Sequence, residues 1–163
     1  PDGRTRAVRL VRDAGAQLVL AGDQHLGLVC RQGVDDFEDG PIFFGGPACA
    51  AFGQRWFEGD GKLENQRNND PNTGNFVDPF GNKMRVLAVA NPKITHAEFE
   101  AGNTAWGKFL ADRALKSEGY GLVRIDHGAG KHIIECWEWN IDPRTGSQFA
   151  GWPVTSPISA PAS

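Results

Sequence analysis

The sequence lacks any CxxC pair, because its three cysteines, Cys30, Cys49 and Cys136, lie far apart in the chain. This spacing excludes the usual zinc knuckle and the thioredoxin-like redox motif. We expect the thiols to act as small buried apolar groups. One disulfide plus one free thiol is the alternative if the protein is exported, because disulfides persist in oxidising compartments.

Long apolar runs are also missing. No stretch approaches the roughly 20 residues that a membrane-spanning helix needs, and no signal peptide is visible. The chain begins at Pro1 and runs at once into a helical pattern. We therefore expect a fragment, or a processed chain whose true N-terminus is missing.

Concentrated positive charge is absent as well. The net charge is −3 with Lys and Arg scattered, so nothing predicts a surface specific for nucleic acid. No GxGxxG or GxxxxGK(S/T) motif opens a helix to cradle phosphates. No GxSxG elbow is present, which leaves no case for serine hydrolysis.

What is present suits one domain, because 163 residues with 40% hydrophobic content can form a sizeable core. Apolar spacing predicts helices over 4–14 and 103–116. Short apolar runs predict strands at 17–21, 26–32, 41–44, 84–90, 120–126 and 131–139, the last two joined by a hairpin turn. The fold class is α/β (α+β), mostly strands with two helices, and we expect 17–21 to be a central strand covered on both faces.

Two stretches are poor in apolar residues. Gly, Asn, Asp and Pro dominate residues 59–82, which predicts a long polar loop that is disordered, a lid, or one wall of a site. The tail from about residue 140 is rich in Pro, Gly and Ser and is expected to be irregular.

The stretch LVLAGDQHLG (18–27) carries the strongest candidate site. Asp23 and His25 follow the 17–21 strand, and ligands bind at the carboxyl ends of strands in α/β sheets. On an extended backbone, residues i and i+2 point the same way, so both side chains would converge on one cation. A carboxylate with an imidazole suits a divalent metal. The alternatives are that Asp23 caps a turn and that His25 is a hydrogen-bonded core residue.

Other polar residues are weaker candidates. His96 lies between Thr95 and Glu98, which is the pattern of a helix N-cap. His127 falls in the predicted hairpin turn, and His132 begins the next strand, both expected at the surface. The acidic run 35–39 is expected to be solvated, with weak calcium binding as the alternative.

The stretch AGDQHL (21–26) resembles the closing GDxH motif of alkaline phosphatase D (PhoD-like) metallophosphatases, within the calcineurin-like metallophosphoesterase superfamily. FGNKMRVLAVANP (80–92) is similar to the strand after that family's long insertion. YGLVRID (120–126), IIECWEWNIDP (133–143) and GWP (151–153) are similar to the C-terminal part of one bacterial branch. The resemblance covers nearly the whole chain, as the C-terminal portion of a larger enzyme.

The resemblance implies a two-sheet sandwich flanked by helices, with a two-metal centre of Ca, Fe, Zn or Mn at the strand ends. It implies phosphoester hydrolysis by metal-activated water and export from the cell. His25 matches the late metal-ligand histidine, and Asp23 stands where many relatives have a second histidine, as a ligand or as support for one. DxH occurs only as Asp23-Gln24-His25 within the GDxH stretch, and the early motifs GDxxxD and GNH(D/E) are absent, so the remaining ligands would lie outside this chain, which alone should be inactive.

A non-catalytic carbohydrate- or ligand-binding module that uses exposed tryptophans is the alternative. Four of the five tryptophans lie beyond residue 105, at positions 106, 137, 139 and 152. Trp137 and Trp139 share one face of the predicted 131–139 strand, which favours the core. Clustered solvent-facing indoles would favour the binding module instead. Substrate, metal identity and oligomeric state are not specified by the sequence.

Overall fold

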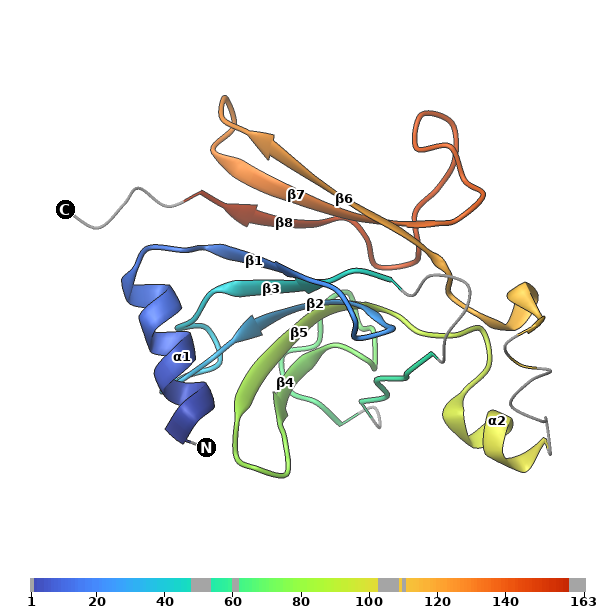
Figure 1. The fold of residues 1–163 in the computed structure, drawn as a ribbon, viewed down its shortest axis with the longest axis horizontal. Helices are drawn as coiled ribbons and strands as arrows, with labels where there is room; N and C mark the ends of the chain where they lie inside the picture. Colours follow the sequence, from blue (N-terminus) through green and yellow to red (C-terminus); the bar gives the residue numbers. More distant parts are fainter. Residues whose placement is uncertain (1, 48–53, 60–61, 103–108, 110, 159–163) are drawn as a thin grey trace.

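The computed structural model describes residues 2–47, 54–59, 62–102, 109 and 111–158 (Figure 1). Its helices are α1 (Asp2–Asp13) and α2 (His96–Ala101), with a short 3-10 helix at Arg113–Leu115. Its strands are β1 (Leu18–Ala21), β2 (Gly27–Gln32), β3 (Ile42–Gly45), β4 (Gly74–Val77), β5 (Lys83–Ala90), β6 (Gly119–Asp126), β7 (Lys131–Glu138) and β8 (Val154–Pro157). The described part of the chain is an α+β fold made mostly of strands, as the sequence predicts.

The strands form a five-stranded sheet in the order β1-β3-β2-β5-β4 and a three-stranded sheet in the order β6-β7-β8. β1 runs parallel to β3, whereas β2 lies antiparallel to both β3 and β5. Strands β1, β3 and β5 therefore run in one direction. Their carboxyl ends meet at one edge of the sheet, which we call the carboxyl edge.

The two sheets pack face to face, and α1 covers the opposite face of the first sheet (Figure 1). The core between the sheets joins Val29, Phe44 and Ala88 of the first sheet to Ile134 and Cys136 of β7. Alternate residues of a strand point to opposite faces. Phe43 accordingly faces α1, where it lines a hollow with Val8 and Val11.

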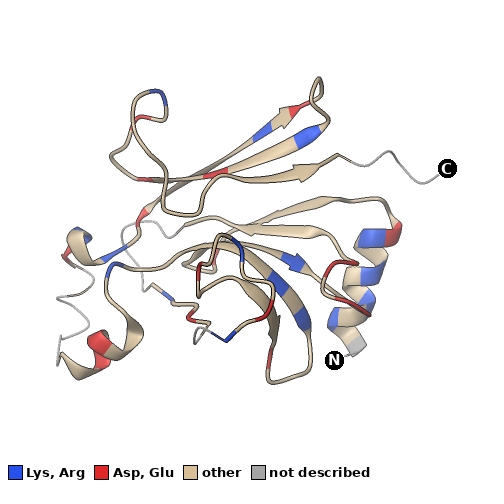
Figure 2. Ribbon diagram, turned by 180° about the vertical axis from the view of Figure 1, so that it is seen from behind, with Lys and Arg blue, Asp and Glu red and all other residues tan. Residues whose placement is uncertain are grey.

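The acidic run 35–39 is paired with basic residues rather than only solvated. Figure 2 shows the acidic loop between β2 and β3 beside the basic positions along the α1 ribbon. Arg9 lies 2.9 Å from Asp35, and Arg12 lies 3.4 Å from Asp39. These pairs attach α1 to the loop between β2 and β3.

The expectation of a central, doubly covered strand at 17–21 is wrong. The strand forms as β1, but it lies at the edge of its sheet, and Leu20 is 62% exposed. The second sheet reaches only part of this face, so Leu18 and Leu20 border an open groove with Val123 and Ile125 of β6.

Two strands lie in segments that the sequence predicts to be irregular. β4 belongs to the polar 59–82 segment and pairs antiparallel with β5. β8 belongs to the tail and pairs with β7. Both strands have only four residues, GNFV and VTSP, which is too short for a clear period-two pattern.

The helix predicted over 4–14 is confirmed as α1. The N-cap pattern at His96 is also confirmed, because Thr95 and Glu98 form a reciprocal capping box at the start of α2. Most of the helix predicted over 103–116 lies outside the described residues; Phe109 and Ala111 are helical. Among the described residues, no helix has the length and apolar character to cross a membrane.

Two cysteines confirm the expectation of small buried groups. Cys30 and Cys136 are free thiols, 1% and 0% exposed. Burial raises the pKa of Cys30 to about 11 and that of Cys136 to about 12. Cys49 lies outside the described residues.

We predict that the folded Cys49→Ser variant resists Ellman's reagent at about pH 8, because the thiolate is the nucleophile and both remaining thiols stay protonated and covered. Absorbance of the released thionitrobenzoate measures the reaction. Both thiols should react quickly once guanidinium chloride unfolds the chain. Stoichiometric labelling of the folded protein within the mixing time would contradict this burial.

Candidate functional site

The loop at residues 22–26 lies at the carboxyl edge, between β1 and β2. Gly46 N donates to Ala21 O at 3.1 Å, which fastens the end of β1 to the end of β3. Gly27 pairs with Ala90 at the end of β5. Asp23 and His25 therefore lie at the strand ends, as the sequence predicts.

The backbone at these two residues differs from the expectation. Asp23 has a φ of 65° and His25 a φ of 57°, so both are left-handed rather than extended. The turn still brings the side chains together, with His25 Nε2 4.0 Å from Asp23 Oδ1. Left-handed non-glycine residues cost free energy and concentrate at functional sites.

The pair fits one corner of a metal site. Metal–ligand distances of about 2.0–2.2 Å place neighbouring donor atoms roughly 3 Å apart. Rotation of the Asp23 side chain can shorten the 4.0 Å separation, since this side chain is fully exposed. No group of three or more His, Cys, Asp or Glu residues that could hold a metal occurs in the described part of the chain. A metal would therefore need further ligands from elsewhere.

The segment 54–59 crosses the carboxyl edge beside His25. Arg55 N donates to His25 O at 3.2 Å. The Asn91 side chain, just after β5, accepts from Phe57 N at 2.9 Å and donates to Phe57 O at 2.7 Å. An irregular segment near the core needs such bonds to satisfy its backbone polar groups.

A hollow lies between this segment and α2. Trp56 forms its aromatic wall, with ring centroids 5.4 Å from Phe99 and 5.2 Å from His96. Glu58 accepts from His96 N at 3.0 Å. Gln54 also lines the hollow, and its buried Nε2 has no hydrogen-bond acceptor among the described residues. The sequence indicates none of this, because residues 54–59 have no periodicity.

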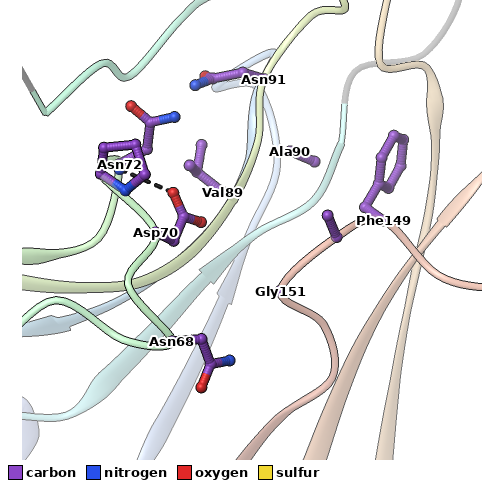
Figure 3. Close-up of a pocket in the computed structure, with 10 residues that line it drawn as sticks. Asn68, Asp70, Asn72, Val89, Ala90, Asn91, Phe149 and Gly151 are labelled. Atoms are coloured by element: carbon purple, nitrogen blue, oxygen red, sulfur yellow. Dashed lines mark hydrogen bonds between the residues drawn. The ribbon is translucent and has the colours of Figure 1, made fainter. Parts of the chain in front are cut away.

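A second cleft, of about 480 Å³, opens at the end of β5 (Figure 3). Asn68, Asp70 and Asn72 form one wall, and residues 149–151 form the other. The floor is the end of β5, residues 89–91. Of the three roles left open for the polar 59–82 segment, the structure shows a wall of a cleft at residues 68–72.

Arg67 holds the two walls of this cleft together. Its guanidinium donates to Gly151 O, to Pro153 O at 2.9 Å and to Leu87 O at 3.3 Å. The polar segment, β5 and the chain leading into β8 are thus joined through one side chain. An arginine can do this because its planar head carries five N–H donors.

Trp137 and Trp139 differ in exposure. Trp137 is buried, as expected, and its Nε1 donates to Glu135 Oε2 at 2.9 Å. The core expectation for Trp139 is wrong: it follows the last residue of β7 and is 51% exposed. Arg113 covers it, with the guanidinium carbon 4.2 Å from the ring centroid.

The remaining indoles do not form an exposed cluster in the described part of the chain. Trp152 is buried against Phe44, and Trp56 is half-buried, with its Nε1 donating to Ile94 O at 2.8 Å. Trp106 lies outside the described residues. This arrangement does not favour a binding surface built from tryptophans.

The two other candidate histidines lie away from the carboxyl edge. His127 is exposed in the turn between β6 and β7, as expected. His132 is half-buried in β7, where it pairs with Ile125 and Ser156 in neighbouring strands. Neither joins Asp23 and His25.

Comparison of the chain with protein-family models, with curated proteins and with solved structures found no match. The resemblance to metallophosphatases therefore stays a prediction from sequence motifs.

We predict that Arg67→Ala lowers the free energy of unfolding by roughly 1–3 kcal/mol, because three backbone carbonyls, two of them partly buried, lose a charged donor. Urea denaturation followed by tryptophan fluorescence measures the change. Arg144→Ala is the matched control, since the ion pair of Arg144 within the described residues is with Asp142, at the surface two positions earlier. Equal stability of the two variants would show that Arg67 does not hold the cleft walls together.

Proposed function

We propose that this chain belongs to a metal-dependent phosphoester hydrolase and supplies one corner of its metal site through His25 and Asp23. The single observation that carries the proposal is the Asp23–His25 turn. Two left-handed residues hold an imidazole nitrogen and a carboxylate oxygen 4.0 Å apart at the carboxyl edge. The GDxH resemblance points to the same two residues.

The surroundings of His25 support this proposal. Its carbonyl is held by Arg55 N at 3.2 Å, which steadies the turn. The Arg55 side chain is exposed and lines the neighbouring hollow. A guanidinium suits a phosphoryl group, because its N–H fork matches two phosphate oxygens.

A bound divalent or trivalent metal would supply Lewis-acid polarisation of a phosphoryl oxygen. In this proposal His25 Nε2 and Asp23 Oδ1 hold the metal, and Arg55 orients the phosphoester. The other ligands come from outside this chain, and the chain alone is inactive. Export from the cell, which the resemblance implies, belongs to the same proposal.

We predict that His25→Ala in the protein expressed from the complete gene lowers kcat/KM for bis(p-nitrophenyl) phosphate roughly 100-fold or more, because a direct metal ligand is lost. Asp23→Ala should lower it about 10–100-fold. His127→Ala, in the exposed turn, is the matched control and should keep full activity. Release of p-nitrophenolate measures the rate.

Metal binding by the 163-residue chain gives a second measurement. Added Mn²⁺ should selectively broaden the NMR signals of residues 22–26, and His25→Ala should remove this effect. An active His25→Ala enzyme, or broadening that is unchanged in this variant, would refute the assignment of His25 as a ligand.

A further inference from the structure

The cleft in Figure 3 presents polar atoms that its own scaffold holds in place. Asp70 Oδ1 accepts from Asn72 N at 2.9 Å. Asn72 Oδ1 accepts from Gly59 N at 3.2 Å. One atom of each side chain is thus used to fix its orientation.

The second atom of each side chain remains available. Asp70 Oδ2 and Asn72 Nδ2 have no hydrogen-bond partner among the described residues. Asp70 Oδ2 faces Gly151 across the cleft, 3.7 Å from the position that a Cβ on Gly151 would take. A fixed carboxylate acceptor and a fixed amide donor therefore border the cleft side by side.

The rest of the cleft is largely apolar. Val89 and Ala90 form the floor, and the half-buried ring of Phe149 stands on the wall opposite Asp70 (Figure 3). An aromatic ring packs well against the C–H face of a sugar. The pairing of an apolar wall with a few convergent polar atoms is typical of small-molecule sites.

This donor and acceptor pair suits two neighbouring hydroxyl groups. One hydroxyl donates to Asp70 Oδ2, and the adjacent hydroxyl accepts from Asn72 Nδ2, since each hydroxyl can do both. A calcium ion suits the cleft less well, because it takes six to eight oxygen ligands. The carbonyl oxygens of Asn72 and Asn91 already accept from the backbone.

We propose that this cleft binds the vicinal diol of a sugar ring, with Asp70 and Asn72 holding the two hydroxyls and Phe149 packing on the ring. The site is separate from Asp23 and His25, and it does not depend on a metal there. Arg67 joins its two walls, so the cleft is formed before a ligand arrives. The diol can belong to a pyranoside or to the ribose of a nucleoside.

Amide NMR titrations of the ¹⁵N-labelled chain test the proposal with two matched pairs of probes. One pair is methyl β-D-glucopyranoside and benzyl alcohol, and the other is adenosine and 2′-deoxyadenosine. At least one diol ligand should give saturable shifts at residues 70–72 and 149–151, with a Kd on the order of 1–10 mM. Its partner without the diol should bind about tenfold or more weakly.

Asp70→Asn keeps the bond to Asn72 N and removes the free carboxylate oxygen. It should weaken binding about tenfold or more, as hydrogen bonds to a charged group contribute that much. Glu64→Gln is the matched control, because it makes the same charge change in the same polar segment outside the cleft. The melting temperature of each variant shows that it is folded.

Any one of the following results would overturn the proposal. The first is that neither diol ligand gives saturable shifts. The second is that a diol ligand and its diol-free partner bind equally well. The third is that the Asp70→Asn and Glu64→Gln variants bind the diol ligand with equal affinity. Shifts at these residues with Ca²⁺ and not with a diol would also overturn it. None of these results bears on His25 as a metal ligand.

Discussion

Burial of one face of each sheet against the other is the constraint on which the rest of this structure depends. Phe44 of β3 makes the central contact, with its ring centroid 5.7 Å from that of Trp152. Gly121 of β6 lies directly over the Phe44 ring, where a Cβ would collide with it. The sheets can approach this closely because a glycine faces the Phe44 ring. Hydrophobic burial of this kind is the dominant favourable contribution to folding.

The polar segments lie at the rim of the sheets, outside the core. Hydrogen bonds rather than apolar contacts attach them to the strands. Asn91 holds residues 54–59 beside His25, and Arg67 holds residues 68–72 beside the chain that leads into β8. Both anchors bind backbone groups, so they position the main chain itself. The turn at Asp23 and His25 and the cleft at Asp70 are thus separate features of one molecule, each built on the end of a strand.

Local patterns predicted the elements that are long and strongly periodic. Helix α1, strand β5 and the β6–β7 hairpin each carry enough apolar positions to show their period. The prediction that β1 is a central strand covered on both faces was wrong, because an apolar run does not reveal how many neighbouring strands a strand has. The prediction that Trp139 is buried was wrong for a related reason. Trp137 and Trp139 would share a face only if the strand included both residues, and β7 ends one residue before Trp139.

The sequence by itself determined that Asp23 and His25 lie together at the end of a strand, since two residues so close in the chain need only a local turn. Their left-handed backbone came from the structure. Only the tertiary structure decided that Asp70 faces Gly151 and Phe149 across a cleft, because these residues are about 80 positions apart. Such contacts depend on which strands pair and how the sheets stack, and a local pattern contains neither piece of information.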